Sequence, residues 1–105
     1  MRAVNTYNKI RDDWYSWTVY IQGADEELSQ IKYITYLLHE SFPNRRLVSK
    51  DLANNFARKT SGWGEFLLRV EAMMKNGEKK HAELWLDLGF DHTQDKKQQY
   101  TGDFI

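Results

Sequence analysis

The chain has 105 residues, the usual size of one domain, and its 15 basic and 15 acidic residues give a formal net charge of zero. Nucleic-acid binders normally carry a basic excess, because neutralised phosphates drive their affinity, so direct DNA or RNA binding is disfavoured. The absence of cysteine excludes disulfides, thiolate catalysis and zinc–thiolate sites.

Segments that address or anchor a chain in a membrane are missing from the sequence. No apolar run approaches the ~20 residues that span a bilayer, and residues 1–13 hold no apolar stretch like a secretory signal. We therefore expect a cytoplasmic protein, or a soluble part of a larger one, without a membrane span. Aromatic residues make up 14% of the chain, more than a core needs, so some should line a surface or a pocket.

Strand patterns dominate the first half of the chain. Residues 1–13 form an N-terminal strand or a lead-in segment. Residues 14–21 (WYSWTVYI) are aromatic and β-branched, with Trp17, Val19 and Ile21 on one face. A turn over 23–27 precedes a second strand, 31–38 (IKYITYLL). Apolar residues over 26–40 also show near-helical spacing, but the β-branched and aromatic content favours a strand.

The second half continues in the same manner after a break at 39–44 and an irregular stretch over 45–55. A short strand is expected at 56–59 and a turn at 60–62. Strands at 66–74 and 81–88 flank Asn76–Gly77, which predicts a two-residue type I′ hairpin turn with positive φ at both residues. The alternation predicts that one set of apolar residues faces the core: Phe66, Leu68, Val70, Ala72, Ala82, Leu84, Leu86 and Leu88. Residues 89–105 are polar and are expected to form a solvated C-terminal extension.

Antiparallel strands that each have one apolar face pack as a sandwich or a barrel. The sequence therefore predicts a single all-β domain with almost no helix.

Two loop segments combine aromatics with small or hydrogen-bonding residues: Leu38–Pro43 (LHESFP) and Gly62–Phe66 (GWGEF). Glycines on both sides of Trp63 indicate a backbone that bends or comes close to something. Aromatic rings on loops at one end of a sandwich have no core to fill, so they pack the loops together or line a slot.

These segments resemble the signature of the YEATS domain, in order and in spacing. The similarity rests on WTVYIQG (Trp17–Gly23), LLHESFPN (Leu37–Asn44), GWGEF, and His81, Leu84 and Leu86 of the last strand. It covers roughly residues 14–88 and is greatest to the prokaryotic YEATS group. The resemblance implies an immunoglobulin-like antiparallel β-sandwich that reads acylated lysine, such as acetyl- or crotonyl-lysine, on a protein partner.

The resemblance also implies a slot between two aromatic walls. His39, Ser41 and Phe42 match one wall. Gly62, Trp63, Gly64 and Phe66 match the other, where Trp63 supplies both a ring and a backbone N–H. Some relatives carry an aromatic lid at the position of Asp13. Either Trp14 or Tyr15 replaces it here, or the lid is absent.

The chemistry of such a slot follows from the residue types. Acylation removes the charge of lysine and leaves a flat amide on an apolar stem. Two rings enclose that plane, each adding about 0.5–1.5 kcal/mol beyond area burial, while the Ser41 hydroxyl and a backbone donor satisfy the amide at about 1 kcal/mol net each. An unmodified ammonium would be desolvated without an acceptor.

Other interpretations of the same residues remain open. His39 and Ser41 can serve only the local loop, and Trp63 can be a core plug. We expect Glu65 to be a solvated or strand-edge charge and Trp85 to be exposed. His81 is expected to be structural. The three histidines lack ligand spacing, so no metal or other cofactor is expected.

Two other functions remain possible besides the recognition of acylated lysine. One is an interaction module of a larger bacterial sensor or defence protein, with a vestigial slot and other domains as partners. The other is a carbohydrate-binding sandwich with exposed tryptophans. An enzyme is disfavoured, because no activated nucleophile, metal cluster or phosphate loop can be named.

Overall fold

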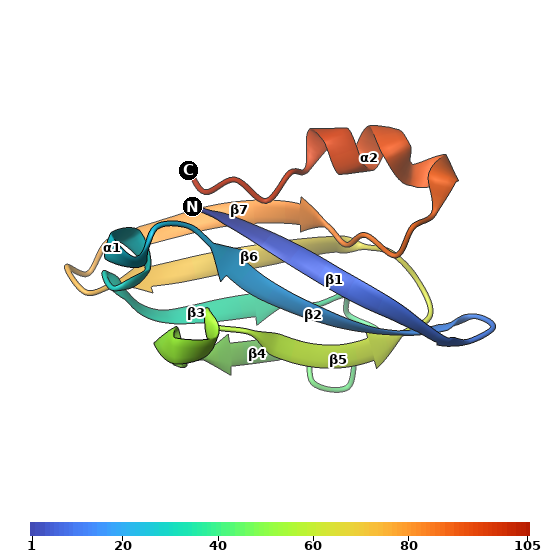
Figure 1. The fold of residues 1–105 in the computed structure, drawn as a ribbon, viewed down its shortest axis with the longest axis horizontal. Helices are drawn as coiled ribbons and strands as arrows, with labels where there is room; N and C mark the ends of the chain where they lie inside the picture. The colour runs from blue at the N-terminus through green and yellow to red at the C-terminus, as the bar shows by residue number, and fades with distance from the viewer.

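The protein is an antiparallel β-sandwich, and the predicted immunoglobulin-like fold is confirmed (Figure 1). The computed structural model describes all residues, Met1–Ile105. One sheet has the order β1 (Arg2–Arg11), β2 (Trp14–Gln22), β5 (Arg58–Gly62); the other has the order β4 (Arg46–Ser49), β3 (Ile31–Leu37), β6 (Leu67–Met74), β7 (Lys79–Trp85). The remaining elements are short: α1 (Asp25–Leu28), η1 (Leu52–Asn54), η2 (Asp91–Thr93) and α2 (Gln94–Gln99). None of these helices has the length and apolarity to cross a membrane.

The core lies between the two sheets and follows the alternation in the sequence. From β2, the side chains of Trp17, Val19 and Ile21 are at most 1% exposed. The residues expected to face inward from the strands at 66–74 and 81–88 are buried, as predicted. Because successive side chains of a strand point to opposite faces, a period of two is enough to assign them.

Residues 31–37 form a strand, so the helical interpretation of 26–40 is wrong. Strand β3 lies between β4 and β6, where Ile34, Thr35 and Tyr36 are all buried. Only the four-residue helix α1 occupies the predicted turn. The Tyr36 hydroxyl donates a hydrogen bond of 2.8 Å to the Phe56 carbonyl, which ties β3 to the segment that leads into β5.

The hairpin between β6 and β7 differs from the predicted type I′ turn. Gly77 has φ +89°, whereas Asn76 is not among the residues with positive φ. The Gly77 N–H donates to the Met74 carbonyl (3.0 Å) and the Met74 N–H to the Glu78 carbonyl (2.9 Å). This is a three-residue loop, a type I turn followed by a left-handed glycine. The Asn76 side chain accepts the Glu78 N–H at 2.9 Å and so stabilises this longer loop.

The C-terminal residues do not form a solvated extension. Residues 100–105 lie between β1 and β7: the Ala3 N–H donates to the Gly102 carbonyl (2.8 Å), and the Gly102 N–H donates to the Glu83 carbonyl (2.9 Å). Gly102 is required here, since a Cβ would stand 2.1 Å from the Ala3 oxygen and φ is +83°. The returning segment therefore joins the two sheets along one edge, running from the end of α2 alongside β7 toward the N-terminus (Figure 1).

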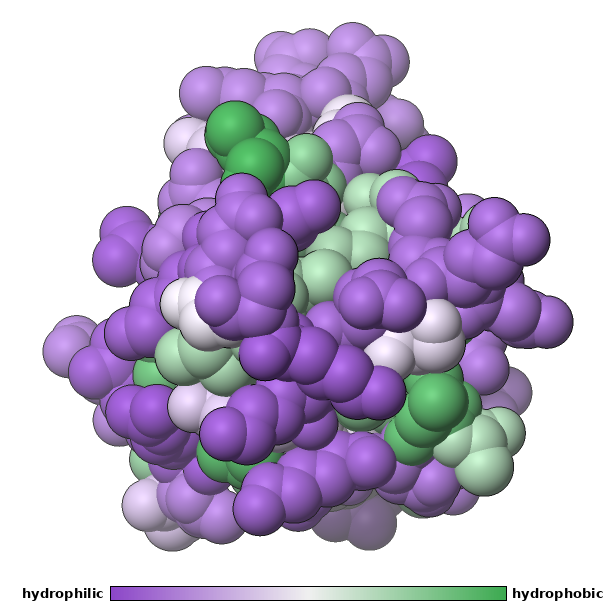
Figure 2. Space-filling view, turned by 90° about the vertical axis from the view of Figure 1, so that its left-hand side faces the viewer, coloured by the Kyte–Doolittle hydropathy of each residue, from purple (hydrophilic) through white to green (hydrophobic).

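The antiparallel order separates the connections into two ends (Figure 1). The β1–β2 turn, the β3–β4 loop and the β5–β6 loop lie at one end. Helix α1, η1 and the β6–β7 turn lie at the other. Figure 2 faces this second end, where hydrophilic residues dominate and hydrophobic ones are scattered in small separate places. The segments Leu38–Pro43 and Gly62–Phe66 belong to the β3–β4 and β5–β6 connections, so both lie at the first end.

Candidate binding site

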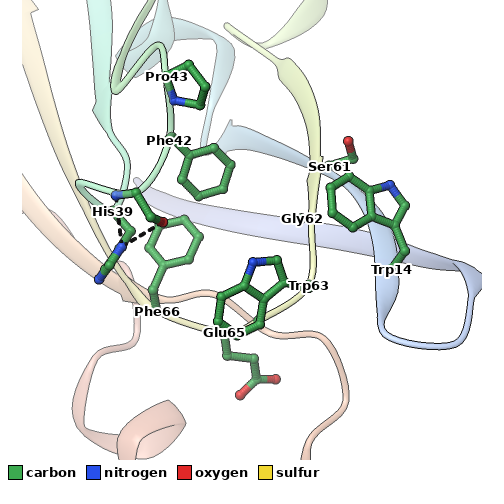
Figure 3. A pocket seen from close by; sticks show the side chains of 11 residues that line it. Trp14, His39, Phe42, Pro43, Ser61, Gly62, Trp63, Glu65 and Phe66 are labelled. Atoms are coloured by element: carbon green, nitrogen blue, oxygen red, sulfur yellow. Dashed lines mark hydrogen bonds between the residues drawn. The ribbon is translucent and has the colours of Figure 1, made fainter.

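The two aromatic loops lie side by side, as predicted from the sequence, and enclose a cavity of about 290 Å³. Figure 3 shows His39, Phe42 and Phe66 on one side and Trp14, Ser61 and Gly62 on the other, with Trp63 between them. The cavity is lined by 11 residues: Trp14, His39, Ser41, Phe42, Pro43, Ser61, Gly62, Trp63, Gly64, Glu65 and Phe66.

The first wall is continuous with the core. The Phe42 ring lies 5.5 Å from Phe66, and these rings lie 6.4 and 5.9 Å from Trp17, in tilted or edge-to-face arrangements. Phe66 is 7% exposed and Trp17 1%. Phe66 therefore belongs to the wall of Phe42, and not to the wall of Trp63 as the resemblance implied. The Phe42 N–H also donates to the His39 carbonyl at 3.0 Å, which closes the turn that carries the ring. The wall is therefore held by buried aromatic packing.

His39 and Ser41 form a small polar unit at the edge of this wall. The His39 Nδ1 atom accepts the Ser41 backbone N–H at 3.1 Å and lies 2.9 Å from the Ser41 Oγ. A ring nitrogen that accepts an N–H carries no proton of its own. The Ser41 hydroxyl is therefore the donor and the His39 Nδ1 atom the acceptor in this contact. The Ser41 oxygen is then left as an acceptor beside the cavity.

The second wall carries its aromatic ring in solvent. Trp63 is 69% exposed, so the interpretation of Trp63 as a core plug is wrong. Gly62 ends β5 and pairs with Tyr15 of β2. A Cβ on Gly62 would stand 3.3 Å from the Phe42 Cζ atom, whereas a Cβ on Gly64 would meet nothing within 4 Å. The glycine at 62 is needed for the close approach of the two walls.

The two lid candidates are separated by the alternation of β2. Trp14 lines the cavity, and the guanidinium of Arg11 lies 5.7 Å from its ring centroid. Tyr15 points to the interior, where its ring lies 6.3 Å from Tyr7 and 5.6 Å from Phe90. Only Trp14 is therefore placed beside the cavity.

Glu65 is not the solvated charge expected from the sequence, because its side chain is 1% exposed. Burial opposes its ionisation, but hydrogen bonds from Thr93, Leu88, Phe90 and Trp85 outweigh this and hold the pKa of the carboxyl below its usual range. Figure 3 shows the carboxylate directed away from the cavity. Its partners lie 20 to 28 residues further along the chain.

Trp85 is also not freely exposed. Its indole N–H donates to the Glu65 Oε1 atom at 3.0 Å, and its ring stacks on Tyr100 with centroids 6.5 Å apart. The tail that was expected to be solvated covers this ring, so the outward-facing position on β7 is partly buried.

Three lining residues were not identified as site residues from the sequence: Pro43, Ser61 and Glu65. Pro43 and Ser61 adjoin predicted residues, so chain neighbourhood could have suggested them. Glu65 lies inside GWGEF, but nothing local reveals that its carboxylate is buried. No group of three or more His, Asp or Glu side chains could hold a metal ion.

Comparison with known proteins gives a family match over most of the chain. The profile described as the prokaryotic YEATS domain matches residues 15–87. A curated relative, the Protein AF-9 homolog of Gibberella zeae (strain ATCC MYA-4620 / CBS 123657 / FGSC 9075 / NRRL 31084 / PH-1), is 35% identical over 72 residues, which cover 62% of this chain and 26% of the relative. The chain thus spans about a quarter of the length of this curated relative.

Solved structures with the same fold include YEATS domains. The Yaf9 YEATS domain recognising an H3K122suc peptide has a TM-score of 0.67 at 24% identity and covers 84% of this chain and 72% of that one. The Yaf9 YEATS domain bound to H3K27ac has a TM-score of 0.66 at 20% identity and covers 85% of this chain and 70% of that one. The yeast AF-9 homolog protein Yaf9 has a TM-score of 0.62 at 25% identity, over 72% and 52%.

Proposed function

The chain belongs to the prokaryotic YEATS domain family, and we propose that it is a binding module whose aromatic cavity receives an acylated lysine of a protein partner. The observation that carries this proposal is the open space between the Phe42 and Trp63 walls, with Ser41 at its edge. A slot without function would be filled by its own rings, whereas Trp63 is 69% exposed.

The polar groups beside the cavity are complementary to an amide. The Ser41 oxygen is free to accept the acyl amide N–H, because its own proton is directed at His39. The Trp63 backbone N–H donates to no protein acceptor, so it is available to the acyl carbonyl. Each such bond contributes about 1 kcal/mol net, and the rings of Phe42 and Trp63 would enclose the amide plane between them.

The same groups disfavour unmodified lysine. Glu65 supplies the only carboxylate among the lining residues, and its oxygens already accept hydrogen bonds from the C-terminal segment. An ammonium ion in the cavity would therefore lose its hydration without gaining a counter-ion. An acetylated or crotonylated side chain brings no charge into the cavity and avoids this loss.

Related structures support this ligand class. Two Yaf9 YEATS domains of similar fold were solved with H3K122suc and H3K27ac. The residues here that match the two walls line one cavity, so the proposal carries the ligand class, and not a particular peptide, to this chain. Proteins or peptides with acylated lysines are the partners we propose.

A calorimetric titration tests the proposal. Acetyl-, crotonyl- and succinyl-lysine peptides of one sequence are compared with the unmodified peptide. We expect at least one acyl peptide to bind roughly tenfold or more tightly than the unmodified one, a difference of about 1.4 kcal/mol. Equal affinity for all peptides, or no binding, would instead favour an interaction module that uses another surface.

A further inference from the structure

Glu65 lies next to the exposed wall of the cavity and is itself buried. It follows Trp63 and Gly64 directly, yet its side chain is 1% exposed whereas Trp63 is 69% exposed. A buried carboxylate is costly unless hydrogen bonds or a cation satisfy it, so the surroundings of Glu65 show what it is bound to.

All of its partners come from the last residue of β7 and the segment that follows it. The Oε1 atom accepts the Trp85 indole N–H at 3.0 Å and the Thr93 hydroxyl. The Oε2 atom accepts the Leu88 N–H at 2.6 Å and the Phe90 N–H at 3.2 Å. The Lys97 ammonium lies 3.2 Å from Oε2 and 2.9 Å from Asp87. Five donors thus fix one carboxylate.

The Trp63 wall has few other supports. Gly62 is held by its pairing with β2, but the Trp63 and Gly64 N–H groups donate to no protein acceptor. The space around the Gly64 Cα is open. The two residues therefore span between a fixed point at Gly62 and a fixed point at Glu65.

We propose that Glu65 is a positioning residue for the Trp63 wall, and that the segment from Trp85 to Lys97 is the support through which it acts. The inference rests on the proposed function for its binding readout. Without the contacts of Glu65, Trp63 and Gly64 would be held only by Gly62 and by the buried Phe66, one residue further along the chain. The Trp63 ring and N–H would then sample positions that do not enclose an acyl group, and affinity would fall.

The substitution Glu65→Gln tests this with little change of shape. All five partners of Glu65 are donors, so an amide nitrogen in place of one oxygen faces further donors whichever way it turns. We expect the contacts to the C-terminal segment to weaken and the affinity for an acetyl-lysine peptide to fall roughly tenfold. The control is Ile31→Val, a core change in β3 at the opposite end of the sandwich.

Three measurements separate positioning from stability. Thermal unfolding gives the stability of each variant, calorimetry below both transitions gives the affinity, and ¹⁵N relaxation gives the order parameters of the Trp63 indole and Gly64 amide groups. Glu65→Gln should lower the order parameters and the affinity; Ile31→Val should change neither. A folded Glu65→Gln protein with the affinity and order parameters of the parent would overturn the proposal.

Two further outcomes need their own measurements: a Glu65→Gln protein that does not fold, and a parent protein that binds no acyl peptide. If Glu65→Gln does not fold, Lys97→Met removes one of the five donors, and it should lower the order parameters at Trp63 and Gly64. Unchanged order parameters in this variant would contradict the proposal. If the parent binds no acyl peptide, the proposed function fails, and the order parameters alone decide whether Glu65 positions the wall.

Discussion

The two walls of the cavity are held in opposite ways. Phe42 packs on Phe66 and, with it, on the buried Trp17, so the first wall is an extension of the core. Trp63 places its ring in solvent and depends on the backbone on either side. Stability and binding should therefore be inseparable at the first wall and separable at the second.

The largest expected effect compares the two walls directly. Trp63→Ala should reduce acyl-lysine affinity by about 2 kcal/mol or more, as for an aromatic hot spot, and change the free energy of unfolding by less than about 0.5 kcal/mol. Phe66→Ala should cost about 3–5 kcal/mol of stability, because it empties a buried site. Denaturant unfolding measures the free energy of unfolding of each variant, and calorimetry measures its affinity for the acyl-lysine peptide. If Trp63→Ala unfolds the protein, stability and binding are not separable at the second wall, and the proposed difference between the walls is wrong.

The two glycines of the second wall sharpen the comparison. Gly62→Ala places a Cβ 3.3 Å from the Phe42 Cζ atom, whereas Gly64→Ala meets nothing within 4 Å. The Phe42 ring must shift by a few tenths of an ångström in the first variant, so we expect a several-fold loss of affinity, about 1 kcal/mol. Gly64→Ala should lose less affinity than Gly62→Ala. An equal loss in both variants would show that the separation of the walls is not what limits binding.

The polar unit of the first wall predicts a role for the His39 ring. Its Nδ1 atom accepts the Ser41 backbone N–H at 3.1 Å and lies 2.9 Å from the Ser41 Oγ atom, so the imidazole holds the hydroxyl group at the edge of the cavity. His39→Phe removes both contacts and should lower the affinity for an acetyl-lysine peptide several-fold, about 1 kcal/mol, as measured by calorimetry.

His39→Gln supplies the control for this experiment, because glutamine can still form hydrogen bonds. This variant should lose less affinity than His39→Phe. Equal losses in the two variants, or no loss in His39→Phe, would leave His39 with a role in loop packing alone.

The smallest expected effect concerns the support of the second wall. The lowered pKa of Glu65 means that its contribution to stability is complete above the unfolded-state value for glutamate. This contribution is lost as the pH falls through the lower folded-state value. Glu65→Gln should therefore flatten the acid side of the stability profile. A residual slope of the free energy of unfolding against pH should remain, because the pKa of Asp87 is also lowered. Urea unfolding at a series of acidic pH values gives the profile, and identical slopes would exclude this role of Glu65.

Strand alternation predicted the inward-facing residues, and the resemblance of the two loop motifs predicted the sandwich and most of the residues that line the cavity, because each depends on side-chain type and spacing. The C-terminal segment was not predictable in this way. Residues 100–105 join the sheets through backbone groups, such as the Gly102 N–H and carbonyl, which have no side-chain pattern. Glu65 looks like any surface charge, since two of its donors are the N–H groups of Leu88 and Phe90.

The most direct test of the central claim is a two-dimensional ¹H–¹⁵N spectrum of the labelled protein during titration with an acetyl-lysine peptide. The account predicts that the largest shift changes fall on residues 39–43 and 61–66, with the Trp63 amide among them, and that the unmodified peptide produces few. Changes confined to the outer faces of the sheets, or the same changes with both peptides, would contradict an acyl-lysine site between the two walls.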